Sequence, residues 1–356
     1  MKIVIIGAGA GGAAAVAELS LAGHEVTLWN RSAETLAPFQ NMGVAYQGVL
    51  GEGVFRPAIT ADLGRAIAGA DVAVVVLPTL SHGPVAMLLA QAGWGSTRPV
   101  VLNPGHTGGA LAFRHAFAAV ASPPPIAEFS TLTYVARKSR PHEVNVTGRA
   151  KRVRCAGLPG GQVAVAAAQA LFPGVVEAGS VLVCDLSNVN MVLHPPGAVL
   201  AAAWVEARAG DFTFYVDAMT PGVTRVMKGL DDERRAVATA FGIELPSVIE
   251  EMRAIGTVSP DAPADDFAVA ISAGEANRRI KGPDTLRHRY FMEDFGYGLT
   301  PFLALAGIAG VAVPVAASLS RLGDIACDVA PGEGRTARSM GIDGMTRDAL
   351  LEAVSG

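Results

Sequence analysis

Several residue types are scarce in this sequence, and each scarcity narrows the range of proteins that it can encode. Only three of the 356 residues are cysteines, and Cys155, Cys184 and Cys327 stand far apart in no metal-ligand spacing. An odd number of scattered cysteines is typical of reduced thiols in a cytoplasmic protein rather than of a disulfide framework. We therefore predict a cytoplasmic protein that binds no metal.

Charge is scarce as well, with 17% charged residues and a formal net charge of −4. This small negative net charge gives no electrostatic reason to expect nucleic acid or an anionic membrane as a partner. Hydrophobic residues make up 51% of the chain, and its length suffices for two domains with ample cores. The composition therefore predicts a globular protein.

One uncharged stretch, residues 299–320, is long enough to cross a bilayer. It is interrupted by Pro301, Gly307, Gly310 and Pro314, and it is rich in Ala, Gly and Val rather than in Leu and Phe. Proline ends one helix and can open the next. We expect two short buried helices that meet near residues 313–314, and no membrane span.

The N-terminus carries more information than any other single stretch of the chain. An apolar run reaching Ile6 enters the Gly-x-Gly-x-x-Gly motif of Gly7, Gly9 and Gly12, and an Ala-rich helix is expected over residues 13–21. In such a motif the first glycine allows a tight turn, the second lets a pyrophosphate approach, and the third lets helix and strand pack closely. The phosphates would contact backbone N–H groups near Ala10 at the positive end of the helix. This predicts a dinucleotide site, against the alternative of a Gly-rich turn without a ligand.

The end of the second expected strand, residues 25–30, decides which dinucleotide fits. An NAD or FAD site usually places an acid there, but this chain has Asn30, Arg31 and Ser32. A guanidinium and a hydroxyl suit a 2′-phosphate. We therefore predict NADP(H) in preference to NAD(H), and we do not expect FAD. In the alternative interpretation, Ser32 only caps the next helix and Arg31 is solvated.

Strand-like and helix-like segments alternate through the first half of the chain, which predicts a doubly wound parallel sheet of the α/β class. Past about residue 180 helical periodicity dominates. We therefore divide the chain into a nucleotide-binding domain over 1–183 and an all-helical domain over 184–356. The strands expected after the second are 54–59, 71–77, 99–102, 126–135, 143–146 and 153–156, and the helices expected in this half are 33–42, 62–68, 82–92, 110–120 and 162–171.

Ligands of doubly wound sheets bind at the carboxyl ends of the strands, where two loops qualify. One contains Pro78, and the other runs from Asn103 through His106 to Gly109. The second loop has glycines for close approach and polar groups for a nicotinamide or a substrate. Its alternative role is that of a simple helix-capping loop.

Two clusters stand out in the helical half. His194 is followed by Pro195 and Pro196, which predicts a histidine at a helix end, able to exchange the proton that reduction of a carbonyl or imine requires. Residues 287–299 are dense in charge and aromatics, although aromatics are only 6% of the chain. There Arg289 could clamp a carboxylate and Asp294 could orient His194. The alternatives are a core histidine and a solvated charged turn.

Three motif groups together resemble the opine dehydrogenase family: residues 102–105 with 108–110, residues 188–190 leading to 194–196, and residues 290–294 with 298–299. The resemblance runs nearly end to end. It implies an N-terminal Rossmann domain followed by a helical domain. It also implies that an α-keto acid condenses with the amino group of an amino acid, and that NAD(P)H reduces the resulting imine.

By this resemblance His194 matches the catalytic histidine, Asp294 its paired aspartate, and Arg289 the arginine that holds the keto-acid carboxylate. Asn103, His106 and Thr131 (or Thr133) match the substrate region less closely. The implied partners are a small keto acid and an amino acid, and a homodimer stays open. Several relatives have an acid after the second strand, where this chain has Asn30 and Arg31.

Two other functions remain as alternatives. A hydroxy-acid dehydrogenase of the ketopantoate-reductase or 6-phosphogluconate type would share the two-domain plan, but it would use a lysine of the helical half. Lys228 and Lys281 are the only lysines past residue 180, and neither stands in such a motif. A non-catalytic NADP-binding regulator would need the glycines and Arg31, but not His194, Arg289 and Asp294.

Overall fold

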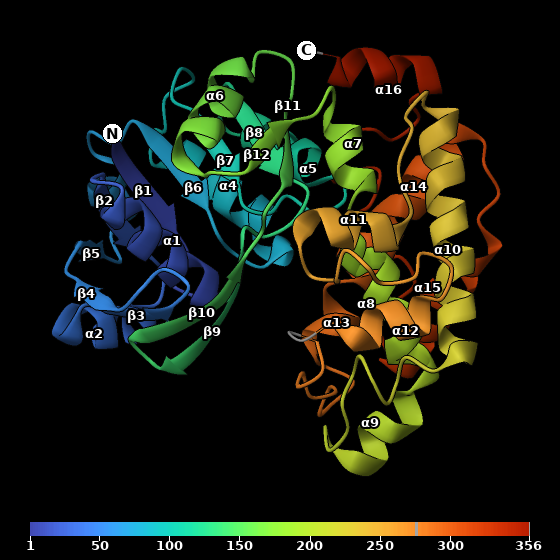
Figure 1. Ribbon diagram of the computed structural model, residues 1–356. Helices are drawn as coiled ribbons and strands as arrows, with labels where there is room; N and C mark the ends of the chain where they lie inside the picture. Colours follow the sequence, from blue (N-terminus) through green and yellow to red (C-terminus); the bar gives the residue numbers. More distant parts are fainter. Residues whose placement is uncertain (275–276, 356) are drawn as a thin grey trace. The chain divides into compact units, whose positions relative to one another are not determined.

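The computed structural model describes residues 1–274 and 277–355, and the chain divides into two units (Figure 1). Unit 1 comprises Met1–Gly105, Gly109–Val181 and the last residues from Val354. Unit 2 comprises Leu182–Ala353 together with His106–Gly108. A three-residue loop of the N-terminal half is therefore part of the second unit.

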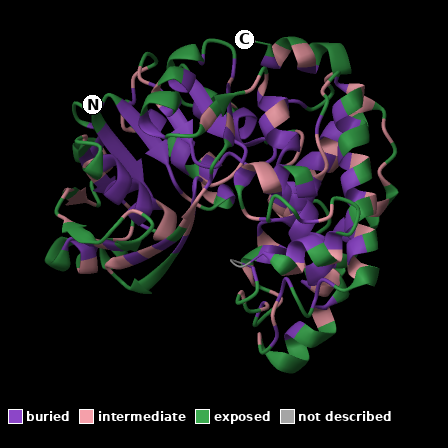
Figure 2. Cartoon of the chain, viewed as in Figure 1, coloured by how far each residue is buried: buried purple, intermediate pink, exposed green. Residues whose placement is uncertain are grey.

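Unit 1 is built on an eight-stranded sheet in the order β12-β11-β8-β7-β6-β1-β2-β5. Its central strand β1 pairs in parallel with β2 and β6, and β1 is buried from Ile3 to Ile6 (Figure 2). The predicted α/β class is confirmed. The strands are β1 (Lys2–Ile6), β2 (Glu25–Trp29), β5 (Ala58–Thr60), β6 (Val72–Val75), β7 (Val100–Leu102), β8 (Ile126–Phe129), β11 (Val153–Gly157) and β12 (Val175–Glu177).

The sheet departs from the prediction at one edge, because β11 runs antiparallel to β8. The chain between these two strands holds a hairpin and no helix. Only a parallel neighbour needs a long crossover connection, so the chain returns here in the opposite direction.

A second sheet, in the order β4-β3-β10-β9, was not predicted. Two of the expected strands are in fact split between the two sheets. The segment 54–59 breaks at Pro57, which has no N–H to donate, and the segment 126–135 breaks at residues 130–133. The strands of the second sheet are β3 (Val44–Gly48), β4 (Gly53–Phe55), β9 (Tyr134–Arg140) and β10 (Glu143–Arg149).

Helix α1 (Ala10–Leu21) contacts both sheets, namely β1 and β2 of the first sheet and β3, β4, β9 and β10 of the second. It is buried continuously from Gly12 to Leu19. A helix covered on several sides needs small apolar residues around its whole circumference, which explains its run of alanines. The other helices of unit 1 are α2 (Ala33–Met42), α3 (Leu63–Ile67), α4 (His82–Gln91), α5 (Gly109–Ala118) and α6 (Gln162–Leu171).

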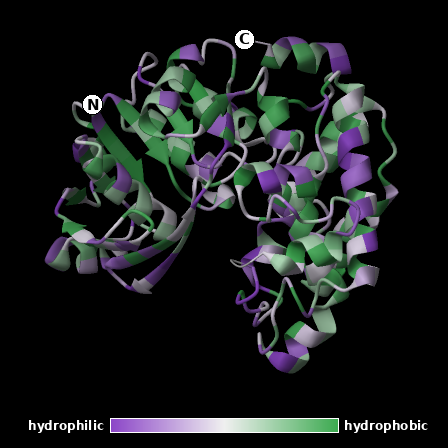
Figure 3. Cartoon of the chain, in the orientation of Figure 1, coloured by the Kyte–Doolittle hydropathy of each residue, from purple (hydrophilic) through white to green (hydrophobic). Residues whose placement is uncertain are grey.

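Unit 2 is helical, and its central element is α8 (Val189–Leu200), which contacts α10, α11, α13, α15 and the π-helix η2. The long α10 (Pro221–Ala240) buries residues that recur every three or four positions and carries hydrophobic and hydrophilic residues, as expected of a helix with one buried face (Figure 3). The remaining elements are α7 (Val181–Leu186), α9 (Ala202–Arg208), α11 (Val248–Ile255), α12 (Phe267–Ala273), α13 (Arg289–Met292), η2 (Phe295–Leu299), α14 (Thr300–Ala309), α15 (Pro314–Ala326) and α16 (Arg347–Val354).

The apolar stretch over 299–320 forms two helices, as predicted. α14 ends at Ala309, Gly310 follows with φ of 70°, and Pro314 opens α15. Over the residues that the structure describes, no helix combines the length and apolarity that crossing a membrane requires.

Candidate functional site

The glycine turn between β1 and α1 has the geometry that the motif predicts. Gly7 has φ of +123°, and a Cβ there would lie 2.2 Å from the carbonyl oxygen of Val76. A Cβ on Gly12 would lie 1.8 Å from the carbonyl oxygen of Gly7, so only glycine fits. A Cβ on Gly9 would meet nothing within 4 Å. The first and third glycines thus serve packing, while the second leaves the helix start at Ala10 open, which fits a dinucleotide phosphate.

Polar groups after β2 are partly engaged in local structure. The Asn30 Oδ1 accepts a hydrogen bond from the Ser32 backbone N–H at 2.9 Å. Ser32 is the N-cap of α2 and accepts from the Thr35 N–H at 3.1 Å, which confirms its capping role. Arg31 is exposed. Pro78, likewise exposed, begins the 3₁₀ turn Thr79–Ser81 after β6.

Asn103 is fully buried at the end of β7 and is paired with Thr133. Its Nδ2 donates to the Thr133 Oγ1 at 2.9 Å, and its Oδ1 accepts from the Thr133 N–H at 3.2 Å. These bonds join the loop after β7 to the loop after β8, where Thr131 is half-buried. Asn103 therefore orders the two loops of unit 1 that follow neighbouring strands.

In unit 2 the structure joins His194 to Asp294. The His194 Nδ1 lies 2.7 Å from the Asp294 Oδ2, and the two side chains are 4% and 2% exposed. Asp294 directly precedes η2, whose π-helical turn is an irregularity that is common at functional sites. Two groups a hundred residues apart thus form a buried hydrogen-bonded pair.

The predicted position of His194 at a helix end is wrong. Helix α8 continues through Pro195 and Pro196 to Leu200, so His194 lies inside it. Each proline removes one helical N–H. The helix tolerates this loss because it is buried over most of its length and contacts five other helices and η2.

Burial by itself would raise the pKa of the Asp294 carboxyl. The charge and hydrogen bond of His194, with the charges of Arg289 and His106, outweigh burial and hold that pKa below its ordinary value. Asp294 is therefore a carboxylate near neutral pH, and it can accept the Nδ1 proton of the imidazole. This arrangement orients a histidine for acid–base chemistry.

Arg289 and His106 both lie near Glu293, the residue before Asp294. The Arg289 Nε is 3.6 Å from the Glu293 Oε2, and the His106 Nε2 is 3.7 Å from the Glu293 Oε1. Burial opposes the positive charge of Arg289, but Glu293 and Asp294 raise its pKa above the ordinary value. The Arg289 side chain is 52% exposed, which leaves it accessible to a carboxylate ligand.

Burial lowers the pKa of the His106 imidazole, and Glu293 and Asp294 only partly counter this effect. His106 has φ of 59°, a left-handed conformation that costs free energy in a residue other than glycine. The loop is held in unit 2 by bonds at its next two residues. The Gly108 N–H donates to the Asp185 Oδ1 at 2.6 Å, and Arg335 donates to the Thr107 carbonyl at 2.6 Å.

The structure thus brings His194, Asp294, Arg289 and His106 together in unit 2, while Asn103, Thr131 and the glycine turn belong to unit 1. Sequence reasoning assigned no role to Tyr215, whose hydroxyl lies 2.7 Å from the His194 Nε2, or to Tyr290, whose ring stacks on His194. One signal was available for Tyr215: it ends an aromatic run, Phe212–Tyr215, in a chain that is poor in aromatics.

Two family models match the chain. The model of the NAD/NADP octopine/nopaline dehydrogenase α-helical domain matches residues 177–327, and that of ketopantoate reductase PanE/ApbA matches residues 3–153. An opine dehydrogenase of Arthrobacter sp. (strain 1C) is 33% identical over 98% of both chains. The chain belongs to the opine dehydrogenase family. It is accordingly an NAD(P)-dependent oxidoreductase that acts on CH–NH donors.

Solved structures show the same fold for this family member. An octopine dehydrogenase determined with NADH and L-arginine superposes with a TM-score of 0.77 at 20% identity, covering 99% of this chain and 98% of its own. A yersinopine dehydrogenase with bound NADP⁺ gives 0.76 at 16% identity, covering 96% and 97%. The ketopantoate reductase model reaches only the nucleotide-binding half, so the hydroxy-acid dehydrogenase alternative is not favoured.

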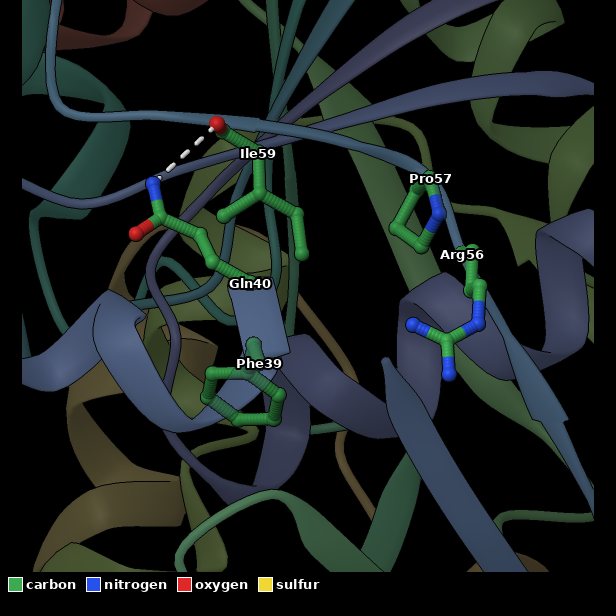
Figure 4. A pocket seen from close by; sticks show the side chains of 5 residues that line it. All are labelled: Phe39, Gln40, Arg56, Pro57 and Ile59. Atoms are coloured by element: carbon green, nitrogen blue, oxygen red, sulfur yellow. Dashed lines mark hydrogen bonds between the residues drawn. The ribbon is translucent and has the colours of Figure 1, made fainter. Parts of the chain in front are cut away.

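One surface pocket of this opine dehydrogenase family member belongs to unit 1. It is lined by Phe39, Gln40, Arg56, Pro57 and Ile59, from the end of α2 and the approach to β5 (Figure 4). The Gln40 Nε2 donates to the Ile59 carbonyl at 3.4 Å beside it. None of the predicted site residues lines this pocket. Among residues 1–274 and 277–355 no group of His, Cys, Asp and Glu is placed to hold a metal.

Proposed function

We propose that this chain catalyses the reductive condensation of an α-keto acid with the amino group of an amino acid, and that it prefers NADPH. The observation that carries the proposal is the buried His194–Asp294 pair with Arg289 close by, in a chain 33% identical to an opine dehydrogenase over nearly its full length. The nucleotide-binding domain is placed at 1–183 and the substrate domain at 184–356.

Each residue of the candidate site has a role in the proposed reaction. Arg289 anchors the keto-acid carboxylate through its guanidinium. His194, oriented by Asp294, polarises the keto oxygen and protonates the hydroxyl that leaves as water after the amine has added. NAD(P)H, when bound at Gly7, Gly9 and Gly12, supplies the hydride that reduces the imine carbon. The product is a secondary amine that bears two carboxylate arms.

Secondary roles follow from the same geometry. His106 faces Glu293 beside Arg289 and is proposed to border the keto acid. Asn103 acts through its bonds to Thr133, and Thr131 on the same loop is a candidate substrate contact. The cofactor contacts are assigned to the three glycines, Ala10 and Pro78, with Asn30, Arg31 and Ser32 near the adenosine ribose.

The preference for NADPH rests on the exposed Arg31 and on the absence of an acid at residues 30–32. Arg31→Ala should lower kcat/KM for NADPH about tenfold, the scale of one hydrogen bond to a charged group, and leave kcat/KM for NADH unchanged. Arg65→Ala, an exposed arginine of α3, is the matched control. Equal losses with both cofactors would remove Arg31 from the 2′-phosphate site.

The decisive experiment is a matrix of keto acids against amino acids. NADPH and NADH absorbance is followed in each combination, and the products are identified by mass. Reductive condensation requires both substrates, so oxidation of NADPH by a keto acid without amine would favour a hydroxy-acid dehydrogenase. Cofactor binding without turnover across the whole matrix would favour a regulator.

Two properties of the whole protein complete the proposal. Over the described residues Cys155, Cys184 and Cys327 are buried thiols outside any disulfide, which supports a reducing, cytoplasmic environment. Cell fractionation tests that location. Light scattering on the purified protein determines whether it is a homodimer.

A further inference from the structure

Both ring nitrogens of His194 have a partner inside unit 2. The Nδ1 lies 2.7 Å from the Asp294 Oδ2, and the Nε2 lies 2.7 Å from the Tyr215 hydroxyl. The imidazole is therefore held from two opposite edges, by a carboxylate on one side and a phenol on the other.

Aromatic rings fix the plane of the imidazole as well. The ring of Tyr290 stacks on His194 with centroids 3.8 Å apart and an interplanar angle of 25°. Phe214 meets the imidazole edge-on at 5.9 Å and packs against Tyr215 at 5.1 Å. Rotation of the imidazole about its axis would break both hydrogen bonds and this packing.

Tyr215 lies in a turn that is stabilised by internal hydrogen bonds. The Asp217 Oδ2 accepts from the Thr213 N–H at 2.7 Å and from the Thr213 hydroxyl at 2.8 Å. The Phe214 N–H donates to the Ile280 carbonyl at 2.9 Å, which ties the turn to the segment before α13. The hydrogen bonds between Thr213 and Asp217 therefore hold the turn in a fixed shape, and with it the buried Tyr215.

The direction of the hydrogen bonds follows from the protonation states. Burial, with the neighbouring Tyr290 hydroxyl, raises the pKa of Tyr215 well above its ordinary value, so the phenol keeps its proton. Asp294 is ionised and accepts from Nδ1–H. In the neutral imidazole Nε2 accepts from the Tyr215 O–H, and in the protonated imidazole Nε2–H donates to the Tyr215 oxygen.

We propose that Tyr215 is a positioning residue for His194, whose hydroxyl holds the Nε2 edge of the ring where the protonated imidazole donates its Nε2–H to the keto oxygen. The proposal rests on the proposed function, because it assigns to His194 the proton transfer of that reaction. Tyr215 acts through the imidazole, and its role is separate from that of Asp294 because it touches the opposite nitrogen.

Tyr215→Phe tests this role because it removes one oxygen and keeps the ring that packs against Phe214. We expect kcat to fall about five- to tenfold, the scale of one hydrogen bond, with the KM values for keto acid, amino acid and NADPH nearly unchanged. In a His194→Asn background the same change should alter kcat less than twofold, because the group it positions is gone. The matched control is Tyr46→Phe, since Tyr46 and Tyr215 are both 7% exposed and Tyr46 lies in β3.

A second measurement needs no turnover. Nitrogen chemical shifts of the His194 ring, assigned with His194→Asn, should move in Tyr215→Phe and stay in place in Tyr46→Phe. Unmoved shifts in Tyr215→Phe, or an equal loss of kcat in both backgrounds, would overturn the positioning role. If the wild type turns over no substrate pair while the shifts move, the proposed function fails and the contact between Tyr215 and His194 stands.

Discussion

The candidate binding regions of the two units are built differently, one from backbone and the other from side chains. In unit 1 the glycine turn that is proposed to bind the cofactor is defined by the absence of side chains, since Gly12 has no room for a Cβ and Gly9 leaves open space. In unit 2 the candidate site is made of side chains that hold one another, from Asp294 through His194 to Tyr215. A backbone site depends on local geometry, whereas a side-chain site depends on contacts between distant parts of the chain.

The largest effect is expected in the side-chain site. His194→Ala should lower kcat by about 10²- to 10⁴-fold, the contribution of a positioned acid–base group, while NADPH still binds with unchanged affinity. Steady-state kinetics and a fluorescence titration of NADPH measure the two quantities. His115→Ala, an exposed histidine of α5, should behave as wild type. Turnover near the wild-type value in His194→Ala would remove the histidine from the mechanism.

The next effect concerns substrate binding in unit 2. Arg289→Ala should raise KM for the keto acid about 10- to 100-fold, because hydrogen bonds to a charged group contribute roughly 1.5–3 kcal/mol. The KM for NADPH should not change. Arg287→Ala is the matched control, since Arg287 is an exposed arginine two residues away. A KM increase of equal size in both variants would indicate a general loss of positive charge instead of a specific clamp.

Two glycine variants test whether the glycines of the turn in unit 1 have separate roles. Gly9→Ala should weaken NADPH binding about tenfold, or about 1.4 kcal/mol, and leave the free energy of unfolding nearly unchanged, because its Cβ meets nothing within 4 Å. Gly12→Ala should also lower the free energy of unfolding by about 1–3 kcal/mol, because its Cβ would meet the Gly7 carbonyl oxygen. Urea unfolding and NADPH titration measure both. Equal destabilisation by the two variants would contradict the division of roles.

The smallest effect is a pH dependence of stability in unit 2. The folded pKa of Asp294 is depressed, since His194 outweighs the opposing effect of burial. Its contribution is therefore present above the unfolded pKa of about 3.9 and is lost as the pH falls through the folded value. Asp294→Asn should lower the free energy of unfolding by about 1 kcal/mol near neutral pH, and the difference from wild type should vanish in acid.

Urea unfolding at a series of pH values measures that dependence. Asp343→Asn changes an exposed aspartate and is the control. A difference between wild type and Asp294→Asn that stays constant down to acid pH would contradict a depressed pKa.

The difference between local geometry and contacts of distant residues explains what could be predicted from the sequence. The turn at Gly7, Gly9 and Gly12 obeys short-range rules, and the structure has it as expected. The prediction of single strands over 54–59 and 126–135 is wrong, because which sheet a strand joins depends on distant partners. α8 runs through Pro195 because burial outweighs helix propensity.

The candidate site of unit 2 shows most clearly which contacts local sequence patterns do not predict. The pairing of His194 with Asp294 was proposed from the chemistry of the two side chains and from the family resemblance, since nothing local links residues a hundred positions apart. Tyr215 was missed because its role appears only when the turn near residue 215 meets α8. A run of aromatics marks such a segment as buried, but it does not say which group the hydroxyl will touch.

The hydrogen bond from Arg335 to the carbonyl of Thr107 joins residues 228 positions apart. During synthesis the loop at 106–108 leaves the ribosome long before its partner exists. A contact of such sequence separation closes a very large loop, and long-range closures slow folding. The strained loop that presents His106 should therefore be among the last parts of the molecule to order, and hydrogen-exchange labelling during refolding should find it protected late.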